Sequence, residues 1–527
     1  MLYFLLSLIP LVYLIYSKSK KSMHMLQQNY YDESNRYLLW IKNNLSKVFI
    51  SADLMLFLIA ISFLFKGLIG NVIFLLLTIF ALIFYKSASG KEQVKKPLVI
   101  TARIKRMFIT LTVLYAILMF FILINFNENN IVIYYLILSF TTYLNYFVLW
   151  LVNKINIPVE KCVYLHYKSM AQKKLKDMHI PVIGITGSYG KTSSKNILND
   201  ILNVKFNSFA TPKNFNTPYG LIRSINNYLD KFNDIFIAEM GAFKVGEINV
   251  TCKLVKPKYG ILTTIGEAHL ESFGSRDNIM KGKFELIESL PSDGIGILNG
   301  DDPYQRKYKM KNDCKILWIG IDNKDADLVA TNIRLSGEGT TFDLIFKGDD
   351  TKYTFQTKLL GKHNVYNVMA AVLLGKELGM SISELQRGVS SVNTIEHRLE
   401  LKKYGNINII DDAYNSNPVG SKMALDVLGL MPGLKIVVTP GMIELGEKQY
   451  EANYNFGTYI SEVADYVILV GKKQTKPIYD GLIKSKYDDE KIYVINDVKE
   501  AFPIMNKLQT ESTYVLLDND LPDLFNE

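Results

Sequence analysis

A glycine-rich stretch near the middle of the chain, "TGSYGKTS" (186–193), carries residue types that bind phosphate. The apolar run "IPVIGI" (180–185) before it is typical of a buried parallel strand, and "SSKNILNDIL" (193–202) after it has helical spacing. A phosphate-binding loop requires this order of strand, glycine loop and helix, because backbone N–H groups and the helix N-terminus then face the phosphates. In this arrangement Lys191 would reach the β- and γ-phosphates of a nucleotide, and the Thr192 hydroxyl would bind Mg²⁺.

The loop departs from the strict phosphate-loop spacing at one glycine. Where the strict pattern has its first glycine this chain has Ile185, and glycines stand at Gly184 and Gly187 instead. A glycine loop formed by chance is the alternative, but such a loop would rarely combine "GKT" with a preceding strand. The residues expected to contact the nucleotide here are Gly187, Ser188, Gly190, Lys191, Thr192 and Ser193.

Further motifs follow in the soluble part of the chain. They are "TPKNFNTPYG" (211–220), "AEMGAFKVGEI" (238–248), "TTIGEAHLESFGS" (263–275), "KGKFELI" (281–287), "LNGDD" (298–302), "GKHNVYNVMAA" (361–371), "EHRLE" (396–400) and "IDDAYNSNP" (410–418). Together with the phosphate loop they resemble the motifs of the Mur ligase family, the ATP-dependent amide ligases of cell-wall peptide assembly. The resemblance runs from Val182 to about Gly457. "EMGAFKVGEI" and "DDAYNSNP" look most like the family members that add D-alanyl-D-alanine to UDP-N-acetylmuramoyl-tripeptide.

The resemblance implies that ATP and Mg²⁺ are used to join a carboxylate to an amine. The carboxylate of a muramoyl-peptide acceptor attacks the γ-phosphate and gives an acyl phosphate, and the amine, D-alanyl-D-alanine or another donor, then displaces phosphate. Because charge gathers on the phosphoryl oxygens, such a site needs metal ions and fixed cations directed at them.

Two residues match metal ligands of the family. Glu239 closes the run "DIFIAEM" (234–240), which has the character of a strand, so its carboxylate is expected at the carboxyl end of a parallel sheet. By resemblance, Glu239 and His269 bind Mg²⁺ and act in catalysis together with Lys191. A solvated acid at a strand end and a structural histidine are the alternatives.

Lys283 matches the family position at which a lysine carries a carbamate, an anion that binds Mg²⁺. Carbamylation needs a neutral amine, so the pKa of this lysine must be lowered by burial and nearby cations. Lys281 is also a candidate by charge, and the spacing before "FELI" selects Lys283. Without the resemblance, the pair would be interpreted as two surface lysines on a helix.

The resemblance also implies substrate contacts. The residues expected beside the phosphates and the acceptor are Asn214, Asn216, Thr217, Asn415 and Asn417. Those expected to bind ATP outside the loop are Asn364 and Asn367 near the adenine, and Arg398 and Asp412 closing from the last domain. The "DDAYNSNP" segment is rich in turn-forming residues, so a purely structural turn is the alternative there.

The chain departs from the family at both ends. Only residues 153–180 precede the loop strand after the apolar region, which is too short for the usual sugar-nucleotide domain. In the last domain, "TPGMIELG" (439–446) stands where the family has LGDM-x-ELG, so an acid is replaced by Gly441, and a family histidine is replaced by Asn453. Near the end, "DND" (518–520) stands where Lys-Gly-Ser is common. These family positions lie near the incoming amine, so the sequence leaves the amine donor open.

The N-terminal region holds five apolar stretches that predict membrane spans: Met1–Tyr16, Phe49–Phe65, Val72–Tyr85, Met107–Ile124 and Ile131–Val152. A span takes about 20 apolar residues, so the first three need flanking residues. Basic residues gather after the first and third stretches, while "NENN" (127–130) has none, and basic loops stay in the cytoplasm. The N-terminus is therefore expected outside and everything after Val152 inside, where ATP is. A signal peptide is the alternative for the first stretch, but it lacks a basic start and a cleavage site.

Charge and cysteine content exclude other classes of protein. Much of the net charge of +9 lies in the loops between apolar stretches, which indicates membrane topology rather than a nucleic-acid surface. The three cysteines form no CxxC pair, so neither a zinc site nor a disulfide framework is predicted.

The sequence thus predicts a multi-domain protein with a transmembrane α-helical region of about five helices (1–152), an α/β central ATP-binding domain (153–395) and an α/β Rossmann-like C-terminal domain (396–527). Both soluble domains should have sheets rich in parallel strands. The expected function is a multi-pass amide ligase of peptidoglycan synthesis in the bacterial cell membrane, with cytoplasmic catalytic domains. The alternatives are a related ligase that modifies a lipid-linked or other envelope polymer, and a membrane ATPase that is not a ligase.

Overall fold

The computed structural model describes residues 2–519 except 33–34, 50–53, 63, 66, 89–96, 337–338, 395–396, 414–416 and 444. The chain divides into two compact units, Met1–His166 and Tyr167–Glu527. Each unit has its own hydrophobic interior and is described by itself.

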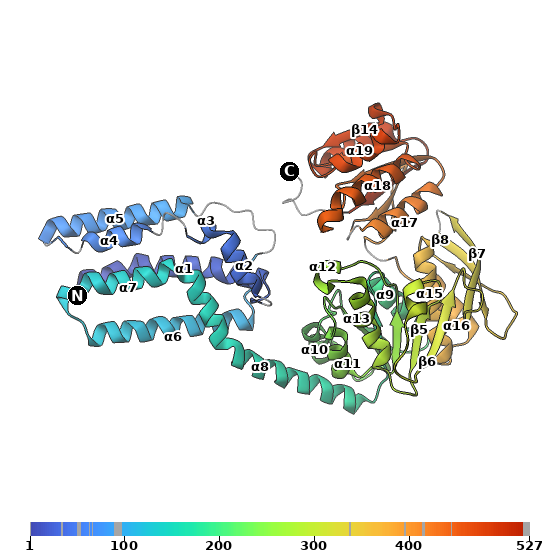
Figure 1. Ribbon diagram of the computed structural model, residues 1–527, viewed down its shortest axis with the longest axis horizontal. Coiled ribbons are helices and arrows are strands. Elements are labelled where there is room, and N and C mark those ends of the chain that lie inside the picture. The colour runs from blue at the N-terminus through green and yellow to red at the C-terminus, as the bar shows by residue number, and fades with distance from the viewer. Residues whose placement is uncertain are drawn as a thin grey trace. The chain divides into compact units, whose positions relative to one another are not determined.

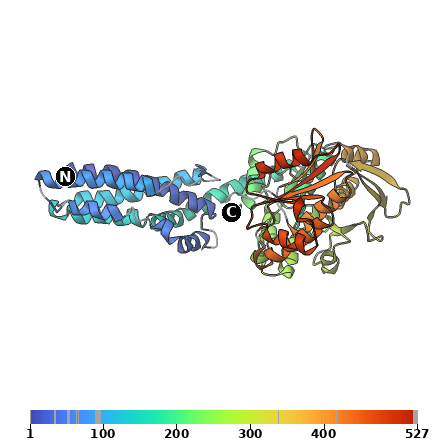
Figure 2. The same cartoon turned by 90° about the horizontal axis from the view of Figure 1, so that it is seen from above.

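The first unit is helical. Its helices are α1 (Leu2–Gln28), α2 (Arg36–Asn43), α3 (Leu45–Val48), α4 (Met55–Ser62), α5 (Gly67–Ala88), α6 (Ala102–Ile124), α7 (Ile131–Tyr143) and the first part of α8 (Asn145–Met178). The long helices lie side by side, coloured blue to teal in Figure 1 and Figure 2. One cluster of buried side chains includes Leu11, Ile59 and Tyr135, and a second includes Met23, Tyr37 and Tyr146.

The predicted five membrane spans are not confirmed. Among the described residues, only α6 is by itself long and apolar enough to cross a membrane, and α7 with α8 counts as a second candidate although the pair is bent by 75°. The apolar part of α1 ends at Lys18, α4 has 8 residues, and the described apolar part of α5 is Val72–Ala81. These lengths fall short of the roughly 20 residues that a span takes. Helices like α6 also occur in soluble proteins and signal sequences, so the anchor and its orientation stay predictions.

Helix α8 carries a polar stripe that is bonded inside the first unit. Asn145 donates to Ser19 Oγ at 2.9 Å, and Asn156 donates to Thr110 Oγ1 at 3.0 Å. Further along the helix, Arg106 pairs with Glu160 at 2.7 Å. The helix continues past residue 152 to Met178, so the predicted domain boundary at 152 falls inside one helix.

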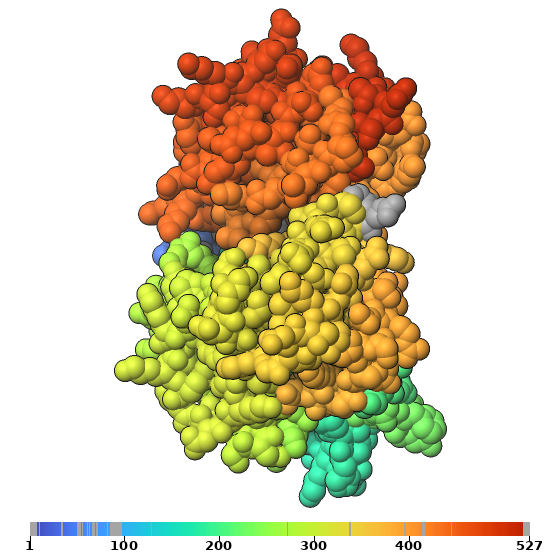
Figure 3. Space-filling model, turned by 90° about the vertical axis from the view of Figure 1, so that its right-hand side faces the viewer, coloured from blue at the N-terminus to red at the C-terminus, as the bar shows by residue number. Residues whose placement is uncertain are grey.

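A mixed sheet of nine strands forms the centre of the second unit. Its strands are β1 (Val182–Thr186), β2 (Ser208–Ala210), β3 (Ile235–Glu239), β4 (Tyr259–Leu262), β5 (Ile295–Asn299), β6 (Lys315–Gly320), β7 (Leu328–Ser336), β8 (Gly339–Phe346) and β9 (Tyr353–Thr357). They lie in the order β2-β3-β1-β4-β5-β6-β7-β8-β9, parallel as far as β7 and antiparallel beyond it. Residues of the antiparallel strands, yellow in Figure 3, form part of the outer surface of this unit.

Helices pack around this sheet. They are α9 (Lys191–Leu202), α10 (Pro218–Asn227), α11 (Glu247–Val255), α12 (Leu270–Phe273), α13 (Arg276–Glu288), α14 (Pro303–Lys307), α15 (Lys362–Glu377) and α16 (Ile382–Ser391). Strands β1 and β3 are buried along their whole length, as expected for parallel strands covered on both faces. The predicted strand at 180–185 and the predicted helix at 193–202 are therefore confirmed as β1 and α9.

The remaining residues of the second unit form a six-stranded sheet. Its strands are β10 (Glu400–Tyr404), β11 (Ile407–Asp412), β12 (Leu434–Thr439), β13 (Tyr466–Val470), β14 (Ile492–Ile495) and β15 (Thr513–Asp518), in the order β10-β11-β15-β12-β13-β14. All neighbours are parallel except β10 and β11. The accompanying helices are α17 (Pro418–Gly429), α18 (Gln449–Ser461), α19 (Lys476–Lys484) and α20 (Ala501–Leu508). The prediction of two α/β regions with parallel-rich sheets is confirmed.

Candidate functional site

A cavity of about 780 Å³ lies where the parallel strands of the nine-stranded sheet end. Glu239 and Asn299, which end β3 and β5, line it, and so does Thr263, which follows β4. Ligands of α/β folds bind at the carboxyl ends of the strands. Arg398 and Asp412, from the region of the six-stranded sheet, line the same cavity.

The glycine loop is shaped by close contact with the strand beside it. At Gly187, whose φ is +154°, a Cβ atom would stand 2.0 Å from Thr263 Oγ1. Gly190 has a φ of +78°, which glycine adopts without strain, and it immediately precedes α9. The Thr263 hydroxyl donates to the Tyr189 carbonyl at 2.6 Å, which fixes the loop against β4.

Lys191 begins α9 and lies over the loop. Its Nζ donates to the carbonyls of Gly187 and Ser188 at 2.8 and 3.1 Å. Burial lowers the pKa of Lys191, Glu239 opposes this effect and Arg398 adds to it. The ammonium is therefore held by the loop at the edge of the cavity.

Glu239 is the centre of a buried polar cluster. The Thr192 Oγ1 lies 3.1 Å from both of its carboxylate oxygens, Asn216 Nδ2 donates to Oε1 at 3.0 Å, and Lys195 Nζ lies 3.1 Å from Oε2. Glu239 is only 1% exposed, so the carboxylate depends on these partners. The alternative of a solvated acid at a strand end is wrong.

His269 also lines the cavity and has a left-handed backbone, with a φ of +61°. Its ring meets that of Phe243 edge to face, with 4.6 Å between centroids. Burial lowers the pKa of His269, and the nearby cations Lys191 and Lys283 lower it further. The imidazole is therefore held in the neutral form, in which a ring nitrogen can accept a metal or a proton.

Lys283 is buried in α13, while Lys281 two residues earlier is exposed. Its Nζ donates to the Ala242 carbonyl at 3.4 Å and lies 5.4 Å from the centre of the Phe273 ring. Burial lowers the pKa of Lys283 to about 7, and Lys191 contributes to the shift. This is the environment that carbamylation needs, although Lys283 is not among the residues that line the cavity.

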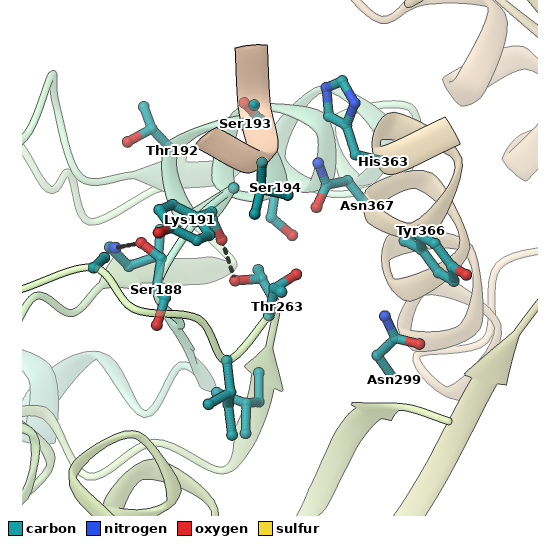
Figure 4. A pocket seen from close by; sticks show the side chains of 18 of the residues that line it. Ser188, Lys191, Thr192, Ser193, Ser194, Thr263, Asn299, His363, Tyr366 and Asn367 are labelled. Carbon is teal, nitrogen blue, oxygen red and sulfur yellow. Dashed lines mark hydrogen bonds between the residues drawn. The ribbon is translucent and has the colours of Figure 1, made fainter. Parts of the chain in front are cut away.

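Helix α15 forms another wall, shown on the right of Figure 4 with His363, Tyr366 and Asn367. Burial lowers the pKa of His363 to about 4, and Arg398 adds to the effect, so this imidazole is neutral at physiological pH. Asn364 of the same helix is buried and is not among the lining residues, and it donates to the Leu360 carbonyl at 2.9 Å.

Arg398, Asp412 and Asn417 line the cavity from the region of the six-stranded sheet. Asp412 ends β11, and its Oδ1 accepts the Leu399 N–H at 3.2 Å. Burial raises the pKa of Asp412 to about 6, although Arg398 acts to lower it. Asn417 lines the cavity and caps α17 by accepting the Gly420 N–H at 3.0 Å.

Most of the predicted site residues come together in this one cavity. Those that line it are Ser188, Gly190, Lys191, Thr192, Ser193, Asn214, Asn216, Glu239, His269, Asn367, Arg398, Asp412 and Asn417. Gly187, Thr217, Lys283 and Asn364 are not among the lining residues, and Thr217 caps α10 by accepting the Gly220 N–H at 3.2 Å. Asn415 lies outside the described residues.

Sequence reasoning missed several polar residues of the site. Asp301 accepts backbone N–H groups of residues 321–323 and the Tyr366 hydroxyl, which is 2.7 Å away. Both Asp301 and Tyr366 line the cavity, as do Asn299 and Thr263. The "LNGDD" motif, which follows an apolar run, was the available signal for Asn299 and Asp301. Lys195 had no signal of its own, because a lysine in a helix is usually exposed.

Gly441 and Asn453, two of the family departures after β12, lie against each other and are not among the residues that line the cavity. Asn453 is 1% exposed and accepts the Met442 N–H at 2.8 Å through Oδ1. Its Nδ2 donates to the carbonyls of Met442 and Gln449, each at 2.9 Å. Both hydrogens of the Asn453 amide are thus used, and the side chain joins the loop after β12 to the start of α18.

The donor atoms of the site suit an ion such as Mg²⁺, which takes most of its ligands from bound phosphates and water rather than from the protein. The described residues contain no group of three or more His, Cys, Asp or Glu side chains that could hold a metal. Mg²⁺ prefers oxygen ligands and is usually bound by one or two carboxylates together with substrate phosphates and waters. Glu239 and the Thr192 hydroxyl, side by side next to the glycine loop, fit that pattern.

The fold and this site define a protein with a phosphate-binding loop on a parallel sheet, followed by a second α/β region that reaches the same cavity. Residues 185–375 match the Mur ligase middle domain, and residues 397–517 match the "Mur ligase, glutamate ligase domain". The chain belongs to the Mur ligase family.

Two curated relatives are named UDP-N-acetylmuramoyl-tripeptide–D-alanyl-D-alanine ligase. The protein of Bacillus subtilis is 34% identical over 310 residues, which are 58% of this chain and 66% of the relative. The protein of Escherichia coli is 30% identical over 295 residues, which are 55% of this chain and 65% of the relative. The chain therefore spans about 65% of the length of these relatives.

Two of the solved structures that are similar to the chain carry the name MurF. MurF from Acinetobacter baumannii has a TM-score of 0.60 at 26% identity, over 68% of this chain and 77% of that one. MurF ligase from Thermotoga maritima in complex with ADP has a TM-score of 0.61 at 27% identity, over 69% of this chain and 81% of that one.

Proposed function

We propose that this chain is an ATP-dependent acid–amino-acid ligase that adds D-alanyl-D-alanine, or a related amine donor, to a muramoyl-tripeptide. The observation that carries the proposal is the juxtaposition of Thr192 and Glu239 beside the glycine loop, 3.1 Å apart, at the strand ends. This arrangement can hold a nucleoside triphosphate and its metal ion. The names of the relatives support the choice of substrates.

Within this proposal, the residues around the glycine loop bind and orient ATP. Backbone N–H groups of residues 190–192, at the N-terminus of α9, face the phosphates, with Lys191 as the cation beside the γ-phosphate. His363 and Asn367 contact the base from α15, and Arg398 closes from the second α/β region. Because the pKa of Lys191 is lowered by burial, its charge is most stable when phosphate is bound next to it.

The chemistry consists of two displacements. A carboxylate oxygen of the acceptor forms a bond to the γ-phosphorus, and the bond from that phosphorus to the bridging oxygen breaks, which releases ADP. The amine nitrogen then bonds to the acyl carbon, the bond from carbon to the phosphate oxygen breaks, and the amine loses one proton. Asn214 and Asn216 are placed to orient the acceptor, and the cations fixed around the cavity stabilise the developing negative charge.

We assign Mg²⁺ to the Thr192 and Glu239 side, where it would neutralise phosphate charge. His269, and Lys283 as its carbamate, are the candidates for a second ion. A lysine with a pKa of about 7 is largely neutral just above that pH, so it can react with CO₂ to form the carbamate. The neighbouring cation Lys191 would then stabilise the anion that results.

The helical first unit is the basis for the proposed location and acceptor of this ligase. In our proposal it is a multi-pass membrane anchor that takes the place of a sugar-nucleotide domain, with the N-terminus outside and the catalytic part in the cytoplasm. The acceptor is then a lipid-linked muramoyl peptide held at the membrane surface. The support for this is α6, with the α7 and α8 pair as a second candidate, among the described residues.

Phosphate release by the detergent-purified full-length chain tests this function. The donor is D-alanyl-D-alanine with ATP and Mg²⁺, and the acceptor is either UDP-N-acetylmuramoyl-tripeptide or its lipid-linked counterpart. Release with either acceptor supports the ligase, and release with the lipid form alone supports the role of the first unit. No phosphate release with either acceptor would point to another envelope polymer as the substrate. Phosphate release that needs no acceptor would favour an ATPase.

A further inference from the structure

Lys195 is a buried lysine one turn into α9. It is 1% exposed and is not among the residues that line the cavity, in contrast to Lys191 and Thr192 on the same helix. Lysine is almost never fully buried unless its charge is paired. The contacts of the Lys195 ammonium should therefore show why this lysine is buried.

The ammonium of Lys195 joins two elements that meet at the site. Its Nζ lies 3.1 Å from Glu239 Oε2 at the end of β3, and it donates to the backbone carbonyl of Lys213. Lys213 has a left-handed backbone with a φ of +49°, which is uncommon for a residue other than glycine. An ammonium has three donors, so one buried lysine can serve both acceptors at once.

The loop that Lys195 holds carries the residues expected to meet the acceptor. Residues 211–217 are fixed at one end by the Thr211 N–H, which donates to the Ile237 carbonyl at 2.9 Å. At the other end, the Asn216 carbonyl accepts the Gly241 N–H at 2.8 Å. Lys213 lies between these two points, so its carbonyl is the one held by a side chain from α9.

The two oxygens of Glu239 have different partners. Oε2 is held by Lys195 and Oε1 by Asn216 Nδ2, while the Thr192 hydroxyl lies 3.1 Å from each. These contacts fix the carboxylate in one orientation, in which the Thr192 hydroxyl is equally far from its two oxygens. In the proposed function, this hydroxyl and the carboxylate bind the same metal ion. A carboxylate without the Lys195 contact could rotate away from Thr192.

We propose that Lys195 is a positioning residue that locks Glu239 toward Thr192 and holds the acceptor loop against it. The inference rests on the proposed function, because it assigns the metal of the bound nucleotide to Glu239 and Thr192. Lys195 itself touches neither the nucleotide nor the acceptor. Its loss weakens metal binding in the nucleotide complex and leaves metal-free nucleotide binding unchanged, since the glycine loop and Lys191 stay in place.

The test is a Mn²⁺ titration of the full-length, detergent-purified chain with ADP, followed by electron paramagnetic resonance. Lys195→Met keeps the length of the side chain and removes its charge and donors. The Mn²⁺ concentration for half-saturation should rise by about ten-fold or more, the size expected when a partner of a metal ligand is lost. ADP binding in EDTA should match that of the unaltered protein. The control is Lys205→Met, which removes an exposed ammonium 3.9 Å from Glu384, and its titration should be unchanged.

Each outcome decides between the claims. If the unaltered chain shows no ADP-dependent Mn²⁺ binding, the proposed function fails and this inference falls with it. If the unaltered chain binds Mn²⁺ and Lys195→Met gives the same titration, even with a lower melting temperature, Lys195 is merely structural and only the inference is overturned. If Lys195→Met does not fold, Lys195→Gln replaces it, because this variant keeps one amide donor group. It should also raise the Mn²⁺ concentration for half-saturation, by a smaller factor. An unchanged titration with Lys195→Gln would again overturn the inference.

Discussion

A Cβ atom on Gly441 would stand 2.8 Å from Oδ1 of Asn453. The two positions at which this chain departs most clearly from the family after β12 are therefore in direct contact. The Asn453 side chain cannot move aside without loss, because it is held by three hydrogen bonds to backbone groups of the loop and of α18. In this conformation, any side chain at position 441 would therefore press on the Asn453 amide.

Gly441→Ala should therefore lower the free energy of unfolding of the C-terminal region by roughly 3 kcal/mol, as a sum of backbone strain at a φ of +81° and damaged hydrogen bonds. Urea denaturation measures the change. The matched control is Gly446→Ala, where φ is +57° and nothing lies within 4 Å, so that only the backbone cost of about 1 kcal/mol applies. Equal losses in the two variants would show that the contact with Asn453 is unimportant.

Lys191→Ala should abolish ATP turnover and leave the fold intact. The ammonium is the cation that the loop holds beside the phosphates, and its bonds are to the loop carbonyls of Gly187 and Ser188 rather than to the core. Phosphate release measures the loss, and circular dichroism checks the fold. Full activity in this variant would remove the phosphate-loop interpretation.

Lys283→Ala should be inactive and partly restored by a short carboxylic acid. The acid would occupy the space of the missing side chain and supply the anion that a carbamate provides. Phosphate release with and without added acetate measures the rescue, and Lys281→Ala, which changes the exposed neighbour, should keep its activity. A folded Lys283→Ala protein that no acid restores would count against the carbamate.

The buried amine of Lys283 should also make stability depend on pH. Its pKa is about 7 in the folded chain, against about 10.4 for an unburied lysine, so between these values the unfolded chain binds more protons. The cost of the buried lysine is fully present below pH 7 and is relieved as pH rises toward 10. In CO₂-free buffer, the unfolding free energy of Lys283→Met should therefore exceed that of the unaltered protein most at pH 6 and least at pH 10. A difference that does not vary with pH would contradict the lowered pKa.

A chain that begins at residue 153, and so lacks nearly all of the first unit, should still bind ATP. The glycine loop, α15 and Arg398 all belong to the second unit, which has its own hydrophobic core. Equilibrium dialysis with ATP measures binding. If this fragment also ligates the soluble sugar-nucleotide acceptor at the full rate, the lipid-linked acceptor is excluded.

The sequence predicted the two α/β regions well because their signals are local. The strand before the glycine loop and the helix after it follow from residues 180–202, and most motif residues do line one cavity. Lys195 and the contact of Gly441 with Asn453 could not be predicted, because burial and proximity of residues far apart in the chain arise from packing. The five spans are not confirmed, for a related reason. The first three apolar runs have 14 to 17 residues, so the sequence predicts helices there but does not by itself show whether one of them can cross a membrane.

The most direct test of the central claim is oxygen transfer during turnover. The acceptor tripeptide is labelled with ¹⁸O in its terminal carboxylate and supplied with ATP, Mg²⁺ and D-alanyl-D-alanine to the full-length chain. An acyl phosphate passes one carboxylate oxygen to the departing phosphate, so mass spectrometry should find one ¹⁸O atom in each phosphate released. Phosphate without ¹⁸O, released while ADP accumulates, would contradict the proposal that this cavity activates a carboxylate.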